Sequence, residues 1–414
     1  MLPVQADAYL SIAERFGTPT YVYDLATVRQ QCQLLKHHLR DVPCDLLYAM
    51  KANANPSILQ VIRDEGLGIE AVSPAEMLVA LELGFAPEQV LFSANNMTNA
   101  EMHRAHASGV LLNIGELSRL ERYGQAYPGS SVSIRLNPQI GAGHHDHVIT
   151  GGAKSKFGIP VEEAKAIQAV AARYDLTIGG LHQHIGSGIL NTEVLWQAIS
   201  VMLQAAEAFP SVRILNFGGG LGVPYRPDEA AFDFENFRAR IVEPLLRFKD
   251  RHPNPDLQYR FEPGRFLVAQ SGVLLAEANT VKSANGRTFV GTDTGMNHLI
   301  RPGMYGSYHH IVNLSNATGA EQAYDVVGNI CESTDVFARD RQLASVREGD
   351  VLAFLDAGAY GFSMASDYNL RSFPAEVIID GGEVILSRER ESAEDYAERF
   401  LSAYRHTEHI QETW

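Results

Sequence analysis

The chain carries, at residues 48–53, the segment Tyr48-Ala49-Met50-Lys51-Ala52-Asn53, in which a lysine directly follows an apolar run. The run Asp45–Met50 is typical of a buried strand. Asn53-Ala54-Asn55-Pro56 then predicts a break and the first turn of a helix. Burial at a strand end lowers the pKa of a lysine, and an uncharged amine forms a Schiff base with an aldehyde. The alternative is a surface lysine that follows a core strand.

Strand and helix patterns alternate regularly from this segment to about residue 265. Helical patterns between the strands include Pro74–Leu83 after the N-cap Ser73, Val161–Tyr174, Thr192–Phe209 and Phe234–Arg251. Eight strand–helix units over about 225 residues predict a parallel (β/α)8 barrel of the TIM type, and a doubly wound open sheet is the alternative. The expected strands are Asp45–Met50, Gly68–Val72, Val90–Ala94, Val110–Ile114, Val132–Leu136, Thr177–Ile185, Val212–Phe217 and Leu257–Phe261.

The alternation of strand and helix patterns ends after the eighth unit, and helical spacing is scarce from there until Ala393–Arg405. Asp380-Gly381-Gly382 between two apolar runs is a hairpin signal. We expect a C-terminal antiparallel β domain at residues 266–414, a barrel at 36–265, and an N-terminal segment at 1–35 whose strand Thr20–Tyr23 joins the β domain. The apolar runs of that domain are Phe266–Ala276, Thr288–Thr292, Tyr324–Val327, Val351–Phe354 and Ala375–Ile379.

Chain length, net charge and cysteine content indicate which broad class of protein this is. A chain of 414 residues predicts two domains, and a net charge of -15 argues against nucleic acid and anionic membranes as partners. Three scattered cysteines, Cys32, Cys44 and Cys331, suit a reducing cytoplasm without a disulfide framework. We expect no signal peptide, no metal site, and no membrane span, because no apolar run approaches about 18 residues.

Functional side chains of such a barrel gather at the C-terminal ends of its strands. Past the sixth strand lies His182-Gln183-His184-Ile185-Gly186-Ser187-Gly188, past the seventh Asn216-Phe217-Gly218-Gly219-Gly220, and past the eighth Glu262-Pro263-Gly264-Arg265. Glycines after the seventh strand let backbone amides approach a phosphate. Arg265 can bind a phosphate as a fixed cation, although an ion pair with Glu262 is the alternative. Lysine, phosphate loop and carboxylate together form the set expected for pyridoxal phosphate.

The β domain adds three polar motifs. They are Leu299-Ile300-Arg301-Pro302-Gly303-Met304-Tyr305, Cys331-Glu332-Ser333 and Asp356-Ala357-Gly358-Ala359-Tyr360. One interpretation is turn chemistry and a core cysteine. The functional interpretation is an anion-binding arginine, a proton-donating thiol and a tyrosine on a phosphate.

Together these motifs are similar to those of the fold-type III pyridoxal-phosphate enzymes, and most closely to the diaminopimelate decarboxylase family. The resemblance covers nearly the whole chain, from Pro19 to Glu376, with the motifs in the family's order. It implies an alanine racemase-like barrel and β domain, with pyridoxal 5'-phosphate as the cofactor. The motifs that carry it are Tyr48-Ala49-Met50-Lys51-Ala52-Asn53, His184-Ile185-Gly186-Ser187, Glu262-Pro263-Gly264-Arg265, Leu299-Ile300-Arg301-Pro302, Cys331-Glu332-Ser333 and Asp356-Ala357-Gly358-Ala359-Tyr360.

The resemblance also implies roles for single residues. Lys51 would hold the cofactor's aldehyde, His184 would lie on one face of the ring, and Glu262 would pair with the ring nitrogen. Cys331 would donate a proton after carbon dioxide leaves, so Lys51, Cys331 and His184 form the expected catalytic set. The rest of the cofactor set is Ser187, Gly218, Gly219, Gly220, Gly264, Arg265 and Tyr360, and the substrate set is Arg265, Arg301, Tyr305, Glu332 and Tyr360.

The implied partners are a small amino-acid substrate and a second copy of the chain. In this family the Cys-Glu segment enters the site of the neighbouring subunit, which implies an obligate homodimer with shared active sites. Four departures from the family pattern leave the expected cofactor chemistry untouched and bear on the identity of the substrate, and the first of them lies near the cofactor. They are Glu70 where aspartate is frequent, Asn329 where proline is frequent, Asn369-Leu370-Arg371-Ser372-Phe373, and the loop segment His144-His145-Asp146-His147.

The implied activity is decarboxylation of meso-diaminopimelate to L-lysine and carbon dioxide, a step of lysine biosynthesis. A carboxylate beside the ring nitrogen keeps that nitrogen protonated, whereas racemases of similar fold place an arginine there, so Glu262 favours a decarboxylase. The alternatives are decarboxylases of the same fold that act on carboxynorspermidine, a basic amino acid or a carrier-linked amino acid. Arg301 argues against a simple diamine precursor, which has no distal carboxylate. A non-catalytic relative usually lacks the lysine, the cysteine or the β domain, all of which are present here.

Overall fold

The computed structural model describes residues 4–141, 143, 150–152 and 155–404. The chain forms two compact units, a barrel unit of residues 24–272 and 358–363, and a β unit of the chain up to Tyr23, residues 273–357 and the chain from Met364 onward. This division differs from the expected boundaries at residues 35 and 265. Helix α2 (Leu25–Leu39) contacts the barrel helices α3 and α11, which explains why it belongs to the barrel unit.

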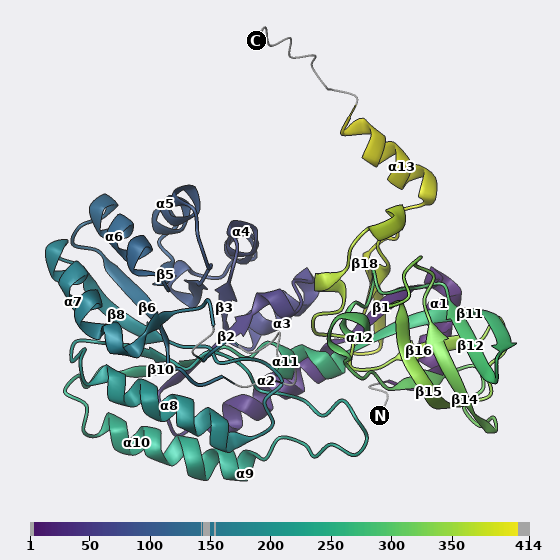
Figure 1. Ribbon diagram of the computed structural model, residues 1–414, viewed down its shortest axis with the longest axis horizontal. Coiled ribbons are helices and arrows are strands. Elements are labelled where there is room, and N and C mark those ends of the chain that lie inside the picture. Colours follow the sequence, from purple (N-terminus) through teal and green to yellow (C-terminus); the bar gives the residue numbers. More distant parts are fainter. Residues whose placement is uncertain (1–3, 142, 144–149, 153–154, 405–414) are drawn as a thin grey trace, which may run out of the picture. The chain divides into compact units, whose positions relative to one another are not determined.

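The barrel unit is a closed ring of parallel strands (Figure 1). Among the described residues, eight strands pair in the order β2-β3-β4-β5-β6-β8-β9-β10, and β10 pairs with β2 again. The predicted barrel is therefore confirmed, and the doubly wound open sheet is wrong. The strands are β2 (Cys44–Ala49), β3 (Gly68–Ala71), β4 (Val90–Phe92), β5 (Leu111–Ile114), β6 (Ser131–Asn137), β8 (Thr177–His182), β9 (Ile214–Asn216) and β10 (Gln258–Phe261), and β7 (Ile159–Pro160) pairs with β6 beside the ring.

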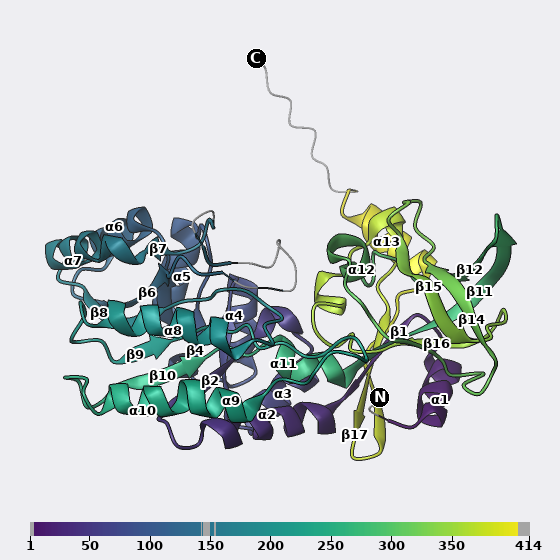
Figure 2. The ribbon, with the colours of Figure 1, turned by 60° about the horizontal axis from the view of Figure 1, so that its bottom comes forward.

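Helices follow the strands and surround the ring (Figures 1 and 2). Several begin at a side chain that accepts the unpaired N–H groups of the first turn, such as Ser73 before α4. No helix in the described part of the chain is long and apolar enough to cross a bilayer. The helices are α3 (Pro56–Asp64), α4 (Pro74–Glu82), α5 (Asn99–Ala107), α6 (Leu117–Ala126), α7 (Ala164–Arg173), α8 (Thr192–Ala206), α9 (Phe234–Phe237), α10 (Glu243–Lys249) and α11 (Arg265–Val268).

One predicted helix is interrupted. The pattern over Phe234–Arg251 forms α9, then a π-helical turn at Arg238–Val242, then α10. Pro244 has no N–H for the carbonyl four residues earlier, which accounts for the wider hydrogen-bond spacing just before it.

The register of the strands places the predicted site residues of the barrel unit around one mouth. β10 lies between β2 and β9, with Phe261 opposite Leu46 and Arg260 opposite Asn216. Because parallel strands end on the same side, the segments after β2, β8, β9 and β10 meet at the C-terminal mouth of the barrel.

The β unit contains a mixed sheet in the order β15-β14-β12-β11-β1-β17-β18, with β16 pairing with β11 and β13. The strand β1 joins this sheet between β11 and β17, as predicted. The pairing of β12 with β14 is parallel, because α12 and β13 carry the chain back before β14 begins, so the sheet is not wholly antiparallel. The strands are β1 (Thr20–Asp24), β11 (Gly272–Ala284), β12 (Arg287–Thr292), β13 (Ile311–Asn313), β14 (Glu321–Val327), β15 (Val336–Ala344), β16 (Val351–Phe354), β17 (Ala375–Asp380) and β18 (Glu383–Arg388).

Two further expectations concern local structure in this part of the chain. The run Phe266–Ala276 is a strand only from Gly272 onward, because its first residues form α11 and a 3-10 turn. A short apolar run does not distinguish the two by periodicity. The hairpin β17–β18 is confirmed, and its turn residues Gly381 and Gly382 have φ of 58° and 92°, which other residues rarely adopt.

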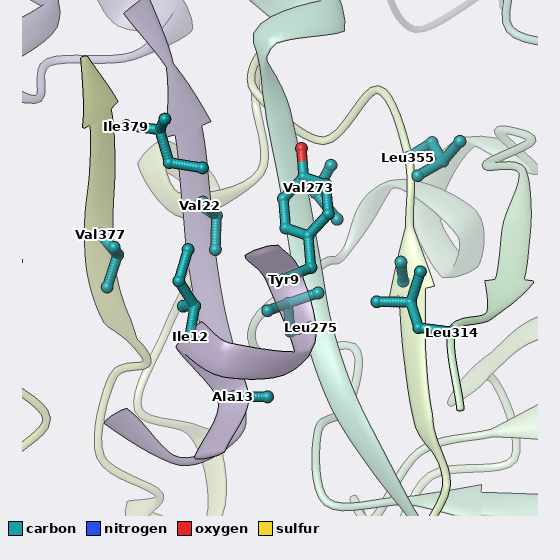
Figure 3. Close-up of a cluster of buried hydrophobic side chains, with 11 residues drawn as sticks. Tyr9, Ile12, Ala13, Val22, Val273, Leu275, Leu314, Leu355, Val377 and Ile379 are labelled. Atoms are coloured by element: carbon teal, nitrogen blue, oxygen red, sulfur yellow. The ribbon is translucent and has the colours of Figure 1, made fainter. Parts of the chain in front are cut away.

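Helix α1 (Ala6–Phe16) covers one face of the β-unit sheet, as Figure 3 shows. Tyr9, Ile12 and Ala13 point from the helix toward Val22 of β1 and Leu275 of β11. These side chains are almost fully buried, so the N-terminal segment contributes to the core of this unit. The unit also contains α12 (Arg301–Tyr305) and α13 (Ala393–Ser402). The end of the predicted helix at Arg405 and the segment His144–His147 lie outside the described residues.

Candidate active site

Lys51 follows β2 in the 3-10 turn Met50–Ala52 and pairs with a carboxylate of the next strand. Its Nζ lies 2.5 Å from Oε2 of Glu70 on β3, and the Glu70 side chain is only 3% exposed. The predicted fall in the pKa of Lys51 is wrong. Burial lowers that pKa, but the negative charges of Glu70 and Glu262 and the hydrogen bond to Glu70 raise it by more, so the net pKa is above the usual value. Burial raises the pKa of Glu70, so this carboxylate is a suitable acceptor for the lysine proton.

Glu262 ends β10 as a buried carboxylate that two side chains hold. Nε2 of His182 lies 3.1 Å from this carboxylate, and Nδ2 of Asn216 donates to its Oε1 at 2.8 Å. Burial alone would raise the pKa of Glu262, but the charge and hydrogen bond of His182 and the charge of Lys51 lower it to about 2. The expected alternative, an ion pair with Arg265, is therefore wrong, since Glu262 faces His182 and Asn216. The mouth thus contains a carboxylate that stays ionised at any ordinary pH.

His184 lies at the same mouth as a neutral ring. Burial, followed by the charges of Lys51 and Arg135, holds the pKa of His184 well below its usual value. Its Nδ1 accepts a hydrogen bond from the backbone N–H of Gly219 at 3.0 Å. An acceptor at Nδ1 places the single ring proton at Nε2. A flat, uncharged imidazole can lie against an aromatic ring without repelling a cation.

The glycine turn after β9 forms a cradle that larger residues would fill. Gly218 and Gly220 have φ of 68° and 122°. A Cβ at Gly218 would lie 2.2 Å from the carbonyl oxygen of Gln183, and one at Gly219 would lie 2.2 Å from that of Glu262. The backbone therefore comes as close to its surroundings as glycine permits, while the N–H groups of Gly218 and Gly219 donate to Asn216 and His184.

A guanidinium and hydroxyl groups gather beside this turn. Arg265 donates from Nε and Nη2 to Oγ of Ser187 at 3.2 and 3.0 Å, and from Nη1 to the hydroxyl of Tyr225 at 2.8 Å. Its guanidinium carbon lies 4.8 Å from the centre of the Tyr360 ring. Gly264 has a different reason to be glycine, because a Cβ there would lie 3.1 Å from that of Ala49. Cation, hydroxyls and glycine cradle fit a phosphate group.

Sequence reasoning missed several residues of this mouth. His182, Asn216 and Tyr225 contact predicted residues but are 80, 46 and 40 positions away from them. Arg135 on β6 is 7% exposed, donates from Nη1 to Asn95 at 3.1 Å, and its charge acts on His184. The available signal was an arginine within a predicted strand of the barrel.

The β unit carries the other predicted residues. Arg301 and Tyr305 lie on α12, and Arg301 is 1% exposed. The guanidinium Nη1 lies 2.9 Å from Nε2 of His309, whose Nδ1 lies 2.8 Å from the carbonyl oxygen of Leu355. The buried arginine is therefore held in one orientation by a histidine that is itself fixed to the backbone.

Cys331 and Glu332 lie at the exposed tip of the β14–β15 hairpin. The Sγ of Cys331 lies 3.4 Å from Oδ1 of Asn369, and the hydroxyl of Tyr368 donates to Oε1 of Glu332 at 2.6 Å. The structure thus brings Cys331 and Glu332 together. It likewise brings together Lys51, His184, Glu262 and the phosphate-type cradle in the barrel unit.

The chain is similar to pyridoxal-dependent decarboxylases over most of its length. Residues 25–269 match the pyridoxal binding domain of the pyridoxal-dependent decarboxylases. The chain is 41% identical to the diaminopimelate decarboxylase of Methanothermobacter thermautotrophicus over 402 residues, which is 94% of this chain and 93% of that protein. It is 36% identical to the diaminopimelate decarboxylase of Escherichia coli over 406 residues, 94% of this chain and 95% of that protein.

Solved structures agree with the sequence relatives. A crystal structure of diaminopimelate decarboxylase from Helicobacter pylori complexed with L-lysine superposes with a TM-score of 0.88 at 30% identity, and covers 95% of this chain and 100% of that chain. One from M. jannaschii in co-complex with L-lysine gives a TM-score of 0.86 at 31% identity, with 94% of each chain covered. The predicted resemblance and the predicted cofactor, pyridoxal phosphate, are confirmed. The chain belongs to the diaminopimelate decarboxylase family of pyridoxal-dependent decarboxylases.

Proposed function

We propose that this chain removes one carboxyl group of meso-diaminopimelate as carbon dioxide and releases L-lysine. The observation that carries the proposal is the buried Glu262 carboxylate, whose pKa is lowered to about 2, at the same barrel mouth as Lys51. Pyridoxal phosphate, when bound, supplies an aldehyde that reacts with amines and a ring that accepts the electrons left by carbon dioxide. An ionised Glu262 would pair with the ring nitrogen and favour a proton there, which would strengthen the ring as an electron acceptor.

Lys51 and Glu70 prepare the amine. The ion pair between them holds the ammonium group at the mouth, and the carboxylate with its raised pKa takes the proton when the amine reacts. His184, neutral and held by Gly219, covers one face of the ring. The hydrogen bonds of the barrel unit thus already favour the proton positions of Lys51 and His184 that this chemistry uses.

Ser187, Arg265 and the cradle Gly218–Gly220 bind the phosphate group, with Tyr360 beside the guanidinium. Binding the phosphate away from the reacting atoms fixes the position of the ring without contributing to its electronics. Remote binding energy of this kind is converted into orientation at the reacting centre.

Residues of the β unit bind the distal amino-acid end of the substrate. Arg301 and Tyr305 bind the distal carboxylate and ammonium together with Glu332, which enters the site with Cys331 from the second copy of the chain. Support comes from the burial of Arg301, which strengthens a charged contact, and from the exposed carboxylate of Glu332 at the hairpin tip. A site with both charges matches a substrate whose two ends are both amino acids.

Cys331 donates the proton that replaces the lost carboxyl group, and it does so in the site of a second copy of the chain. The hairpin tip is exposed, and large apolar side chains near it are exposed as well, with Met304 at 47%, Tyr368 at 44% and Leu370 at 56%. Exposed apolar groups around a functional tip favour coverage by a partner. We therefore propose a homodimer with shared sites, in the cytoplasm, where Cys32, Cys44 and Cys331 stay reduced.

A mixing experiment tests the shared site. Lys51→Ala and Cys331→Ala proteins, each nearly inactive, are unfolded together and refolded as a mixture. Half of the dimers are then mixed, and one of their two sites is intact, so about a quarter of wild-type activity returns. No recovery from a mixture that forms dimers would contradict the shared site.

A substrate panel tests the activity itself. Purified protein with pyridoxal phosphate is supplied with meso-diaminopimelate, carboxynorspermidine, lysine, ornithine or a carrier-linked amino acid, and carbon dioxide release is measured. We expect meso-diaminopimelate to be turned over with the highest kcat/KM. Turnover of another compound in place of meso-diaminopimelate would overturn the proposed substrate and leave the cofactor chemistry intact.

A further inference from the structure

The hairpin loop that carries Cys331 and Glu332 is exposed at its tip but anchored at its base by a buried acid. Residues 331–334 are exposed, whereas Asp335 is only 3% exposed. A charged group is almost never buried without specific partners. The contacts of Asp335 therefore indicate what this carboxylate is for.

Asp335 uses both carboxylate oxygens and its own backbone to fix the loop. Its Oδ2 accepts a hydrogen bond from the backbone N–H of Ile330 at 2.7 Å, and its Oδ1 accepts one from Met296 at 2.6 Å. Its N–H donates to the carbonyl of Glu332 at 3.1 Å, and its own carbonyl accepts from Gly328 at 3.1 Å. The residues on both sides of Cys331 are thus tied to Asp335, Ile330 by its carboxylate and Glu332 by its backbone N–H.

The chain leaves space for this carboxylate with glycine on two sides. A Cβ at Gly328 would lie 2.3 Å from Oδ1 of Asp335, and a Cβ at Gly295 would lie 3.0 Å from its Oδ2. A larger residue at position 328 would displace the carboxylate, and one at position 295 would crowd it together with the side chain of Ile330, 2.7 Å from the added Cβ. The pocket therefore fits an aspartate and its two backbone donors.

The same carboxylate joins two segments that the proposed function uses. Met296 belongs to the turn that leads into α12, where Arg301 and Tyr305 lie. Within α12, Gly303 packs on the loop base, since a Cβ there would lie 3.0 Å from the carbonyl oxygen of Thr334. Asp335 thus bridges the segment of Cys331 and Glu332 to the segment of Arg301.

We infer that Asp335 is the positioning residue that holds Cys331 and Glu332 in the orientation in which the hairpin tip presents them to the second copy of the chain. This inference rests on the proposed function for the roles of those two residues. An ionised carboxylate accepts at both oxygens, whereas an amide has one acceptor and presents N–H groups at the other position. A single change from oxygen to nitrogen therefore breaks one of the two ties, to Met296 or to Ile330, with almost no change in volume.

The test is Asp335→Asn, with Asp325→Asn as the matched control. Asp325 lies on β14 of the same hairpin, is 2% exposed, and accepts a backbone hydrogen bond from Asp340 at 2.9 Å, so it reports general loosening of the hairpin. We expect kcat on meso-diaminopimelate to fall about 100-fold in Asp335→Asn, the scale of a misplacement near 1 Å. The visible absorbance of the bound cofactor stays unchanged, because no cofactor contact is altered.

Coupling to the thiol separates positioning from general destabilisation. In a Cys331→Ala background, Asp335→Asn is expected to lower kcat far less than in wild type, because the misplaced group is already absent. An equal fold loss in both backgrounds, or an equal loss in Asp325→Asn, overturns the inference. If Asp335→Asn does not fold, Gly295→Ala keeps the carboxylate but crowds it, and the same comparison is made with that variant.

A chemical readout stays valid if the proposed function fails. Cys331 is exposed, while burial raises the pKa of Cys32 and of Cys44, so iodoacetamide modifies Cys331 first. We expect a several-fold change in its alkylation rate in Asp335→Asn and no change in Asp325→Asn. Full activity of Cys331→Ala would remove the proton-donor role from the proposed function, whereas an unchanged alkylation rate in Asp335→Asn would remove the positioning role.

Discussion

Replacing Glu262 by glutamine tests the carboxylate on which the proposed chemistry depends. The side chain keeps its size, and Nδ2 of Asn216 can still donate to the remaining carbonyl oxygen. The new NH2 group faces Nε2 of His182, which must give up its proton to accept. A neutral His182 then carries its single proton on Nδ1, an atom that is buried without a hydrogen-bond partner among the described residues.

The magnitude follows from the pKa of Glu262. Its surroundings lower the pKa from 4.5 to about 2, which corresponds to about 3 kcal/mol in favour of the anion. The surroundings therefore hold position 262 as an anion, and we expect the uncharged glutamine to lower kcat by about 100-fold, which corresponds to about 3 kcal/mol of barrier. The unsatisfied donor on His182 costs about 1–3 kcal/mol of folding stability in addition.

Two assays measure these effects. Carbon dioxide release gives kcat at saturating cofactor, and urea unfolding at several pH values gives stability. Because the folded pKa of Glu262 is lowered, its contribution is present above about pH 4.5 and is lost as the pH falls toward 2. Wild type therefore loses stability over this window, and Glu262→Gln loses less.

Asp350→Asn is the matched control for Glu262→Gln. Asp350→Asn changes a carboxylate of the β unit that accepts hydrogen bonds from Asn313 and Arg347, and should leave kcat unchanged. A kcat for Glu262→Gln within twofold of wild type, with the cofactor bound, would refute the reasoning about the ring nitrogen.

Further predictions concern four positions. Lys51→Ala removes the only amine assigned to the aldehyde, so we expect loss of the visible absorbance band and of turnover; a retained band would assign another amine. Cys331→Ala should lower kcat with cofactor affinity unchanged, as fluorescence titration would show, and full activity would exclude the thiol. Gly219→Ala places a methyl group 2.2 Å from a backbone carbonyl, so cofactor affinity should fall at least tenfold, measured by equilibrium dialysis. Asp24→Ala removes the acceptor for two N–H groups of α2 and should cost about 1 kcal/mol in urea unfolding without a change in kcat.

The barrel could be predicted because the sequence signals for its strands and helices are local. Each strand is a short apolar run and each helix has a 3.6-residue pattern, so alternation alone gave the ring and its mouth. Boundaries were less certain, as α2 and the first half of Phe266–Ala276 show, because helix and strand compete over short apolar runs. The parallel pairing of β12 with β14 also has no local signature.

The electrostatics of the mouth could not be predicted in the same way. The pKa of Lys51 depends on Glu70, which is 19 positions away, and that of Glu262 on His182, which is 80 positions away. Burial predicted a lower pKa for the lysine, and carboxylates brought close by the fold reversed the sign. Residue types at strand ends thus indicated which groups meet, but not which proton each one keeps.

The path of the chain limits how this protein can be divided. The polypeptide leaves the barrel unit after Gly272, builds most of the β unit, and returns for the strap Gly358–Ser363 before it leaves again. The strap binds the end of β2 through hydrogen bonds from Tyr360 N and Ser363 Oγ to the carbonyl of Ala52. A fragment cut at residue 272 therefore lacks a piece of its own barrel mouth. Insertion, deletion or shuffling of whole domains at this boundary would separate the Tyr360 ring from the Arg265 guanidinium that it covers.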